Sequence, residues 1–116
     1  MSLNNYADDG YFAPKKIAAL LATTQEDLAQ SVGLGRDAVM RRDRIRAAKT
    51  QRRLREMVEV LNKVTPRFGS PMMAYAWYRS QPLAGFAGQT AMQLSQAGRS
   101  MDVLEYIDAV DAGIHS

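Results

Sequence analysis

The chain has 116 residues, of which 47% are hydrophobic, and its net charge is +3. This length suits one domain, or two very small helical units that share a core, and the apolar content is too high for wholesale disorder. With no cysteine and a single histidine, His115, the sequence excludes disulfides, thiolate sites and any histidine-based metal site or catalytic dyad within one chain, so we predict a protein that is not an enzyme and needs no cofactor or metal.

The first predicted elements are a polar arm and a short helix. Residues 1–13 are rich in Asn, Asp and Gly and show no apolar period, so we expect a flexible arm. Pro14 suits the first turn of a helix that runs through Ile17 and Leu21. The apolar run of this helix is too short for a signal peptide or a membrane span, so we expect a cytoplasmic protein that does not bind membranes.

Residues 25–44 follow the spacing of a helix-turn-helix. Thr24 is a suitable N-cap for the second helix, and Gly33 can take the positive φ that the turn requires. Ala29 is small enough to let two helices cross closely. The places that this motif buries hold Leu28, Val32, Leu34 and Val39.

The third predicted helix begins near Arg36, in the most basic part of the chain. Residues 36–55 hold nine basic and two acidic side chains, which gives a net charge of +7. One continuous helical face is expected to point into the major groove of DNA, and it consists of Arg36, Asp37, Met40, Arg41 and Arg44. Arginine suits bidentate recognition of guanine on such a face.

The remaining arginines of this block leave two interpretations open. Arg52 and Arg53 are expected to hold phosphates, or else to solvate the surface. The alternative for the whole block is a solvated face of an ordinary helical bundle. Arg42 favours that alternative, because the motif usually buries an apolar residue at this place.

A long helix, a second shorter helix and a loop are predicted next. Thr50 can cap the long helix, whose buried stripe consists of Leu54, Met57, Val58 and Leu61. Residues 65–69 break the pattern, and Ser70 with Pro71 restarts it as the N-cap and first residue of another helix. A loop rich in Gly and Pro follows at residues 81–88.

The chain is predicted to end in two capped helices. Thr90 caps a short helix closed by Gly98, and Ser100 caps a last helix closed by Gly113. No strand-like alternation appears, so we predict an all-α fold. Its parts are a flexible arm at 1–13, a helix-turn-helix and dimerisation unit at 14–64, and a second helical unit at 65–116.

The second unit resembles the toxin-binding domain of the Xre/MbcA/ParS antitoxin family. The likeness rests on the run from Ala74 to Arg79, the Pro82–Gly88 loop, the Thr90 cap, the Gly98 break and the last helix. With the helix-turn-helix it covers roughly residues 15–113. The chain departs from the family pattern at Ala91, where a proline is common, and in the short tail after Gly113.

The resemblance implies an antitoxin that occludes a RES-domain toxin, a protein that destroys NAD⁺. It also implies a homodimer that represses its own operon by binding promoter DNA. The residues expected to contact the toxin are Trp77, Pro82, Leu83, Phe86, Asp108, Asp111 and Ile114. The net charge of −3 over residues 80–116 suits docking to a basic site, although an acidic face can also be merely solvated. A free-standing transcriptional regulator and a scaffold protein without a DNA role are the other interpretations.

Overall fold

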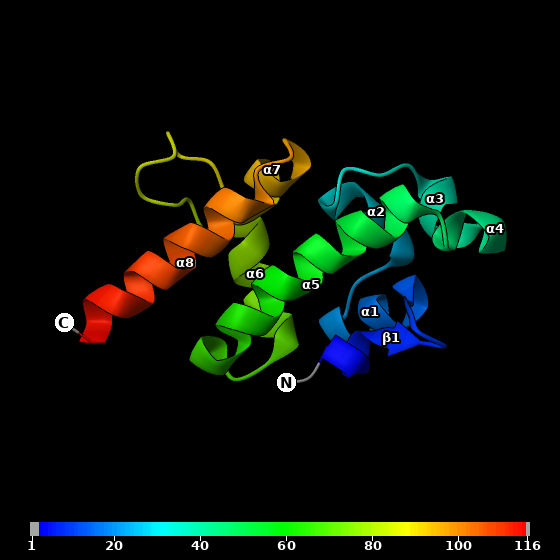
Figure 1. The fold of residues 1–116 in the computed structure, drawn as a ribbon, viewed down its shortest axis with the longest axis horizontal. Coiled ribbons are helices and arrows are strands. Elements are labelled where there is room, and N and C mark those ends of the chain that lie inside the picture. The colour runs from blue at the N-terminus through cyan, green and yellow to red at the C-terminus, as the bar shows by residue number, and fades with distance from the viewer. Residues whose placement is uncertain (1–2, 116) are drawn as a thin grey trace.

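One long helix, α5, runs through the middle of the molecule (Figure 1). The computed structural model describes residues 3–115, and the side chains of residues 5–113. In chain order its elements are the 3-10 helix η1 (Leu3–Tyr6), strands β1 (Ala7–Asp8) and β2 (Tyr11–Phe12), and helices α1 (Pro14–Leu21), α2 (Gln25–Ser31), α3 (Arg36–Met40), α4 (Arg42–Ile45), α5 (Ala48–Phe68), α6 (Pro71–Ser80), α7 (Ala91–Gln96) and α8 (Ser100–His115). The predicted all-α fold is confirmed, and the molecule is elongated, at 46 × 27 × 22 Å.

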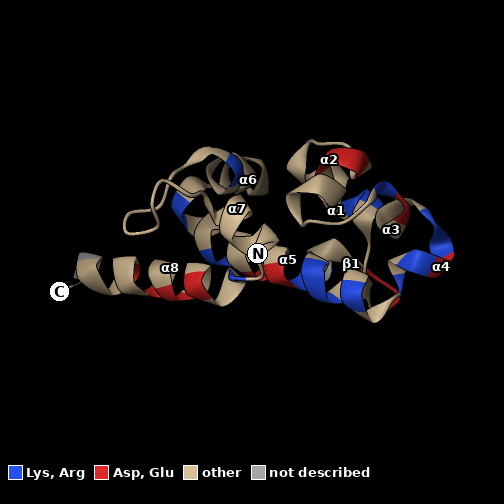
Figure 2. Cartoon of the chain, turned by 90° about the horizontal axis from the view of Figure 1, so that it is seen from above, with Lys and Arg blue, Asp and Glu red and all other residues tan. Residues whose placement is uncertain are grey.

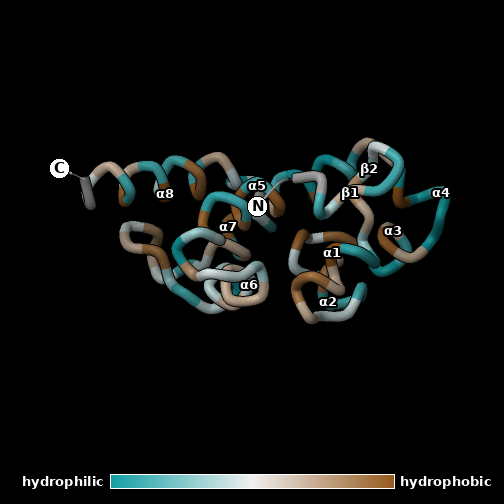
Figure 3. Tube along the Cα trace, turned by 90° about the horizontal axis from the view of Figure 1, so that it is seen from below, coloured by the Kyte–Doolittle hydropathy of each residue, from teal (hydrophilic) through white to brown (hydrophobic). Residues whose placement is uncertain are grey.

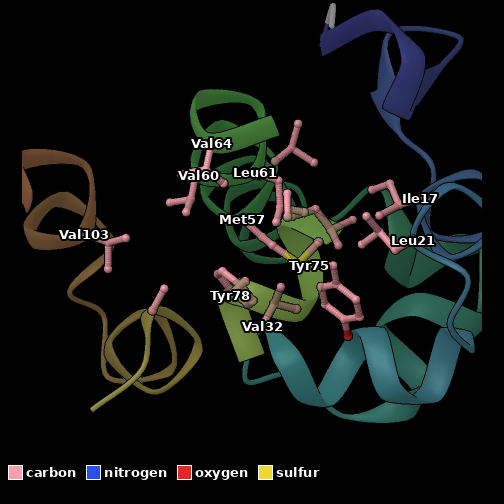
Figure 4. Close-up of a cluster of buried hydrophobic side chains, with 14 of the residues drawn as sticks. Ile17, Leu21, Val32, Met57, Val60, Leu61, Val64, Tyr75, Tyr78 and Val103 are labelled. Atoms are coloured by element: carbon pink, nitrogen blue, oxygen red, sulfur yellow. The ribbon is translucent and has the colours of Figure 1, made fainter. Parts of the chain in front are cut away.

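The buried stripe of α5 joins the two halves of the chain. All four predicted positions of this stripe are fully buried, as are Val60 and Val64. Around them lie side chains from α1, α6 and α8, among them Ile17, Tyr78 and Val103 (Figure 4). Burying one large apolar side chain stabilises a fold by about 1.5–3 kcal/mol. The predicted units at 14–64 and 65–116 therefore share one core.

The N-terminal segment is folded against the helices, so the expectation of a flexible arm at 1–13 is wrong for its described residues. Tyr6 is completely buried, and β1 pairs with β2 in antiparallel register, Ala7 opposite Phe12. The side chain of Gln51 on α5 accepts a hydrogen bond from the Phe12 N–H (2.8 Å) and donates one to the Phe12 carbonyl (3.0 Å). This contact spans 39 residues, so no local pattern could predict how the hairpin docks on α5. The strand pair itself has a local signal, because Asp9 and Gly10, both with positive φ, form the two-residue turn that joins the strands.

Helix α5 is longer at both ends than its pattern suggested. It begins at Ala48, so Thr50 lies inside the helix, where it is buried and does not cap it. It continues through Pro66 to Phe68, and Gly69 caps it with a φ of +86°. Proline at this place is tolerated because it removes a single backbone hydrogen bond from the last turn.

The caps of the following helices are mostly as predicted. Ser70 accepts a hydrogen bond from the N–H of Met73 (3.2 Å). Thr90 and Gln93 form a capping box, in which each side chain accepts from the other residue's N–H at 3.2 and 2.9 Å. These hydroxyl caps satisfy helix N–H groups that have no partner within the helix.

Both predicted ends of the last helix are wrong. Ser100 is the first residue of α8, and its hydroxyl lies 2.9 Å from a carboxylate oxygen of Glu56 on α5. Gly113 lies inside α8, which runs to His115, and Gly113 lacks the positive φ typical of a glycine that ends a helix.

Candidate nucleic-acid and partner-binding surfaces

Helices α2 and α3 form the predicted helix-turn-helix arrangement. The Thr24 hydroxyl caps α2 by accepting a hydrogen bond from the N–H of Asp27 (3.0 Å). Ala29 is 1% exposed at the crossing, and Gly33 turns the chain with a φ of +73°. Leu28, Val32 and Val39 are buried as predicted, and Leu34 is half-buried. The local geometry that the motif requires is therefore present.

The third helix of the prediction is broken in two, so its continuous face is wrong. Arg41 has extended backbone angles (φ −89°, ψ 127°) and separates the five-residue α3 from α4. An unbroken helix would place Arg42 one turn after buried Val39, which would bury a guanidinium. The break leaves Arg42 exposed instead.

The predicted DNA-binding residues of this region are exposed but divided between elements. Arg36, Asp37 and Met40 lie on α3, Arg41 lies at the break, and Arg44 lies on α4. Arg41 also makes an exposed ion pair with Asp43 (3.6 Å). Met40 lines a groove of about 270 Å³ together with Tyr11 and Val39, so part of this side chain faces the hairpin.

Basic residues gather along α3, α4 and the start of α5 (Figure 2). In Figure 3 the chain at α4 is correspondingly hydrophilic. Arg52 is exposed, as a phosphate contact requires. Arg53 is half-buried and donates a hydrogen bond to the Ser95 carbonyl (2.8 Å), so its predicted DNA contact is replaced by a link between α5 and α7.

Polar contacts, two of them buried and one exposed, link the helix-turn-helix to the second half of the chain. The hydroxyl oxygens of Ser31 on α2 and Tyr75 on α6 are 2.6 Å apart. Gln96 donates its amide N–H to the Gln30 carbonyl (2.7 Å), and the Tyr78 hydroxyl donates to the Ser31 carbonyl at 3.4 Å. Burial raises the pKa of Tyr78 well above its ordinary value of 10.0, so this phenol is neutral at physiological pH.

The predicted toxin-binding apolar residues differ in their accessibility. Leu83 is 2% exposed, so the structure assigns it to the core, and the prediction that it contacts a partner is wrong for this conformation. Pro82 is exposed at the start of the loop. Trp77 packs against Phe68 with 6.2 Å between ring centroids, and Phe86 packs edge-on against Tyr106 at 6.0 Å. Both rings are half-buried, so each keeps some surface for a partner.

The predicted acidic contacts on α8 already have partners within the chain. Asp108 forms an ion pair with Lys63, and Asp111 forms one with Arg67. Lys63 and Arg67 are four residues apart on α5 and the two aspartates are three apart on α8, so each pair spans about one helical turn. In the sequence, the signal for these ion pairs is this one-turn spacing of two basic residues on one helix and two acidic residues on another. The side chain of Ile114 lies outside the described residues.

The described residues show neither a membrane-spanning helix nor a metal-binding cluster. Among the described helices, none has the length and apolarity needed to cross a membrane. The described residues also contain no group of three or more His, Cys, Asp or Glu side chains placed to hold a metal ion. Comparisons of the chain with protein-family models, curated proteins and solved structures gave no match. The resemblance to the antitoxin family therefore rests on the sequence pattern alone.

Proposed function

We propose that this protein is an antitoxin that binds a RES-domain toxin through its C-terminal half and promoter DNA through its helix-turn-helix. The observation that best supports two separate surfaces is the distribution of charge along the molecule. Basic residues gather along α3, α4 and the start of α5, whereas α8 carries all four acidic residues of the C-terminal half, residues 65–116 (Figure 2). DNA would be attracted to the first region and repelled by the second.

In the proposed DNA complex, α3 reads bases and α4 holds the backbone. Arg36 is the first residue of α3, and Arg41 follows its last residue, so both ends of this short helix carry a guanidinium. Arg44 lies beyond the break, on a different element, which suits a phosphate contact better than a base contact. Repression of the protein's own operon, as a homodimer on a two-fold site, is part of the proposal.

In the proposed toxin complex, the loop after α6 and the exposed part of α8 supply the contacts. Pro82 and the accessible edge of Phe86 lie on this loop. Met101 at the start of α8 is 66% exposed, and methionine is common at binding surfaces because its side chain adapts to different shapes.

A free-standing transcriptional regulator is the second candidate, and the ion pairs of α8 favour it. Asp108 and Asp111 are paired with Lys63 and Arg67, which weakens the case for an acidic surface kept free for a basic toxin. The two candidates share the DNA-binding role and differ in whether the C-terminal half has a partner.

A gel-shift titration with the protein's own promoter tests the shared DNA-binding role. The double substitution of Arg36 and Arg41 by alanine should weaken binding to the promoter much more than binding to an unrelated duplex, because lost base contacts cost about 1–3 kcal/mol each. Replacement of Arg79, an exposed arginine on α6, is the matched control and should leave the promoter affinity unchanged. If the wild-type protein fails to bind the promoter at low salt, the repressor role is wrong.

A further inference from the structure

A second groove lies between the β1–β2 hairpin and the start of α5. Its volume is about 500 Å³, and the side chains of Arg46, Arg52 and Arg55 line it. Its lining, which consists of described residues, includes no Asp or Glu. The groove is therefore strongly cationic.

The positions of these arginines follow from the geometry of α5. Residues 48, 51, 52 and 55 all line the groove, and this spacing of three, one and three places them on one face of a helix. Lys49 and Arg53 do not line the groove: Lys49 is exposed, whereas Arg53 is hydrogen-bonded to the Ser95 carbonyl of α7. Part of the basic segment at residues 36–55 therefore lines the groove, and the rest of it lies outside.

The walls of the groove are held in place by the side chain of Gln51. Besides its two hydrogen bonds to the backbone of Phe12, Gln51 donates to the carbonyl of Ile45 at 2.8 Å. One amide therefore connects α5, the hairpin and the end of α4. Because the walls are already fixed, the protein loses less conformational entropy when an anion binds.

Two of the three guanidinium groups lack an internal counter-charge. Among the described residues, no carboxylate forms an ion pair with Arg46 or Arg52, whereas Arg55 is paired with Glu59 (2.9 Å). Arg46 lies 4.5 Å from the centre of the Tyr11 ring, so the aromatic face is already covered by a cation. This arrangement favours an anion over a stacked base as the occupant.

We propose that this groove binds phosphate groups, with Arg46, Arg52 and Arg55 as the cationic ligands. Guanidinium matches phosphate geometry because its planar fork donates two parallel hydrogen bonds. The groove is much larger than a single phosphate, and Arg46 also lines the neighbouring groove beside Arg42. Asp8 and Asp9 line that neighbouring groove as well, so its charge is mixed, and the wholly cationic lining is confined to the second groove. The size of the second groove suits a run of phosphates, either along a DNA strand or in a free polyphosphate.

A titration of the ¹⁵N-labelled protein with sodium tripolyphosphate, at constant ionic strength, tests the proposal. The amide signals of Gly10 and Tyr11 should shift and saturate. Arg52→Gln should weaken binding about tenfold, because it removes a charge-assisted contact. Lys49→Gln removes the same charge from the same helix outside the groove, and it should change the affinity less than about twofold. Arg46→Gln removes a second charge from the groove and should also weaken tripolyphosphate binding.

Two results would overturn the phosphate groove. One is a tripolyphosphate titration that does not saturate at these amides. The other is an equal loss of affinity in the Arg52→Gln and Lys49→Gln variants, which would mean that diffuse charge explains the binding.

A competition with a short promoter duplex identifies the source of the phosphate, and this arm alone rests on the proposed function. Displacement of tripolyphosphate by the duplex would assign the groove to the DNA backbone. Binding of both without displacement would assign it to a free polyphosphate. If tripolyphosphate binds and the duplex does not, the proposed DNA binding fails while the groove stands.

Discussion

The hydrogen bond between Ser31 and Tyr75 gives a sharp test of how the two halves of the chain are joined. The Ser31 hydroxyl donates its proton to the Asp27 carbonyl (2.9 Å), so in the 2.6 Å contact the Tyr75 hydroxyl must be the donor. Removing the Tyr75 hydroxyl and removing the Ser31 hydroxyl therefore leave different groups without a hydrogen-bond partner. Tyr75→Phe leaves an acceptor without a partner, whereas Ser31→Ala leaves a buried phenol proton without one.

The expected losses of unfolding free energy differ for this reason. Tyr75→Phe should cost about 1 kcal/mol, the usual net value of one hydrogen bond. Ser31→Ala should cost about 1–3 kcal/mol, because Tyr75 is only 3% exposed and its orphaned hydroxyl would be desolvated. The double variant should lose less than the sum of the two, since no unpaired hydroxyl then remains.

Urea denaturation of the wild-type protein, both single variants and the double variant measures these losses. A loss of 1 kcal/mol corresponds to a midpoint shift of about 0.3–1 M urea for a small protein. Additive losses, or a larger loss for Tyr75→Phe than for Ser31→Ala, would refute the assigned donor and the coupling between the halves.

Three further predictions concern stability. Burial raises the pKa of Tyr78, so the folded state keeps a proton that the unfolded chain releases above about pH 10. The contribution of this phenol to stability should therefore be constant below that pH and fall above it, and the unfolding free energy, followed by circular dichroism between about pH 9 and 11, should fall less steeply for Tyr78→Phe. Gly33→Ala should cost about 1–2 kcal/mol in thermal unfolding through its positive φ alone, because an added Cβ would meet only Gln96 at ordinary contact distance; a cost near zero would argue against the left-handed turn. Asp108→Asn should cost at most about 1 kcal/mol and less in high salt, because its ion pair with Lys63 is largely exposed; a cost that is independent of salt would contradict this.

The features that could be predicted from the sequence are those set by neighbours in the chain. Thr24, Ser70 and Thr90 cap helices because each supplies a hydroxyl just before a helical segment. The buried stripe of α5 follows from apolar spacing, and the turn at Gly33 follows from the need for a positive φ.

Most of the missed features depend on contacts between distant residues. The docking of the hairpin depends on Gln51, 39 positions from Phe12, and Asp108 and Asp111 of α8 pair with basic side chains of α5 more than 40 positions away. The break at Arg41 arises because a continued helix would turn Arg42 toward the core beside Val39. The resemblance to the antitoxin family placed Leu83 on the partner surface, yet the loop folds this side chain into the core.

Co-expression with the RES-domain protein proposed to share its operon tests the central proposal most directly. Induction of that protein alone should stop growth, and co-expression of this chain should restore it, with both proteins recovered together in a fixed ratio. Pro82→Asp with Phe86→Ala, on the loop proposed to bind the toxin, should reduce the rescue, whereas Lys49→Gln should not. If growth still stops while this protein is abundant and folded, the antitoxin function is wrong.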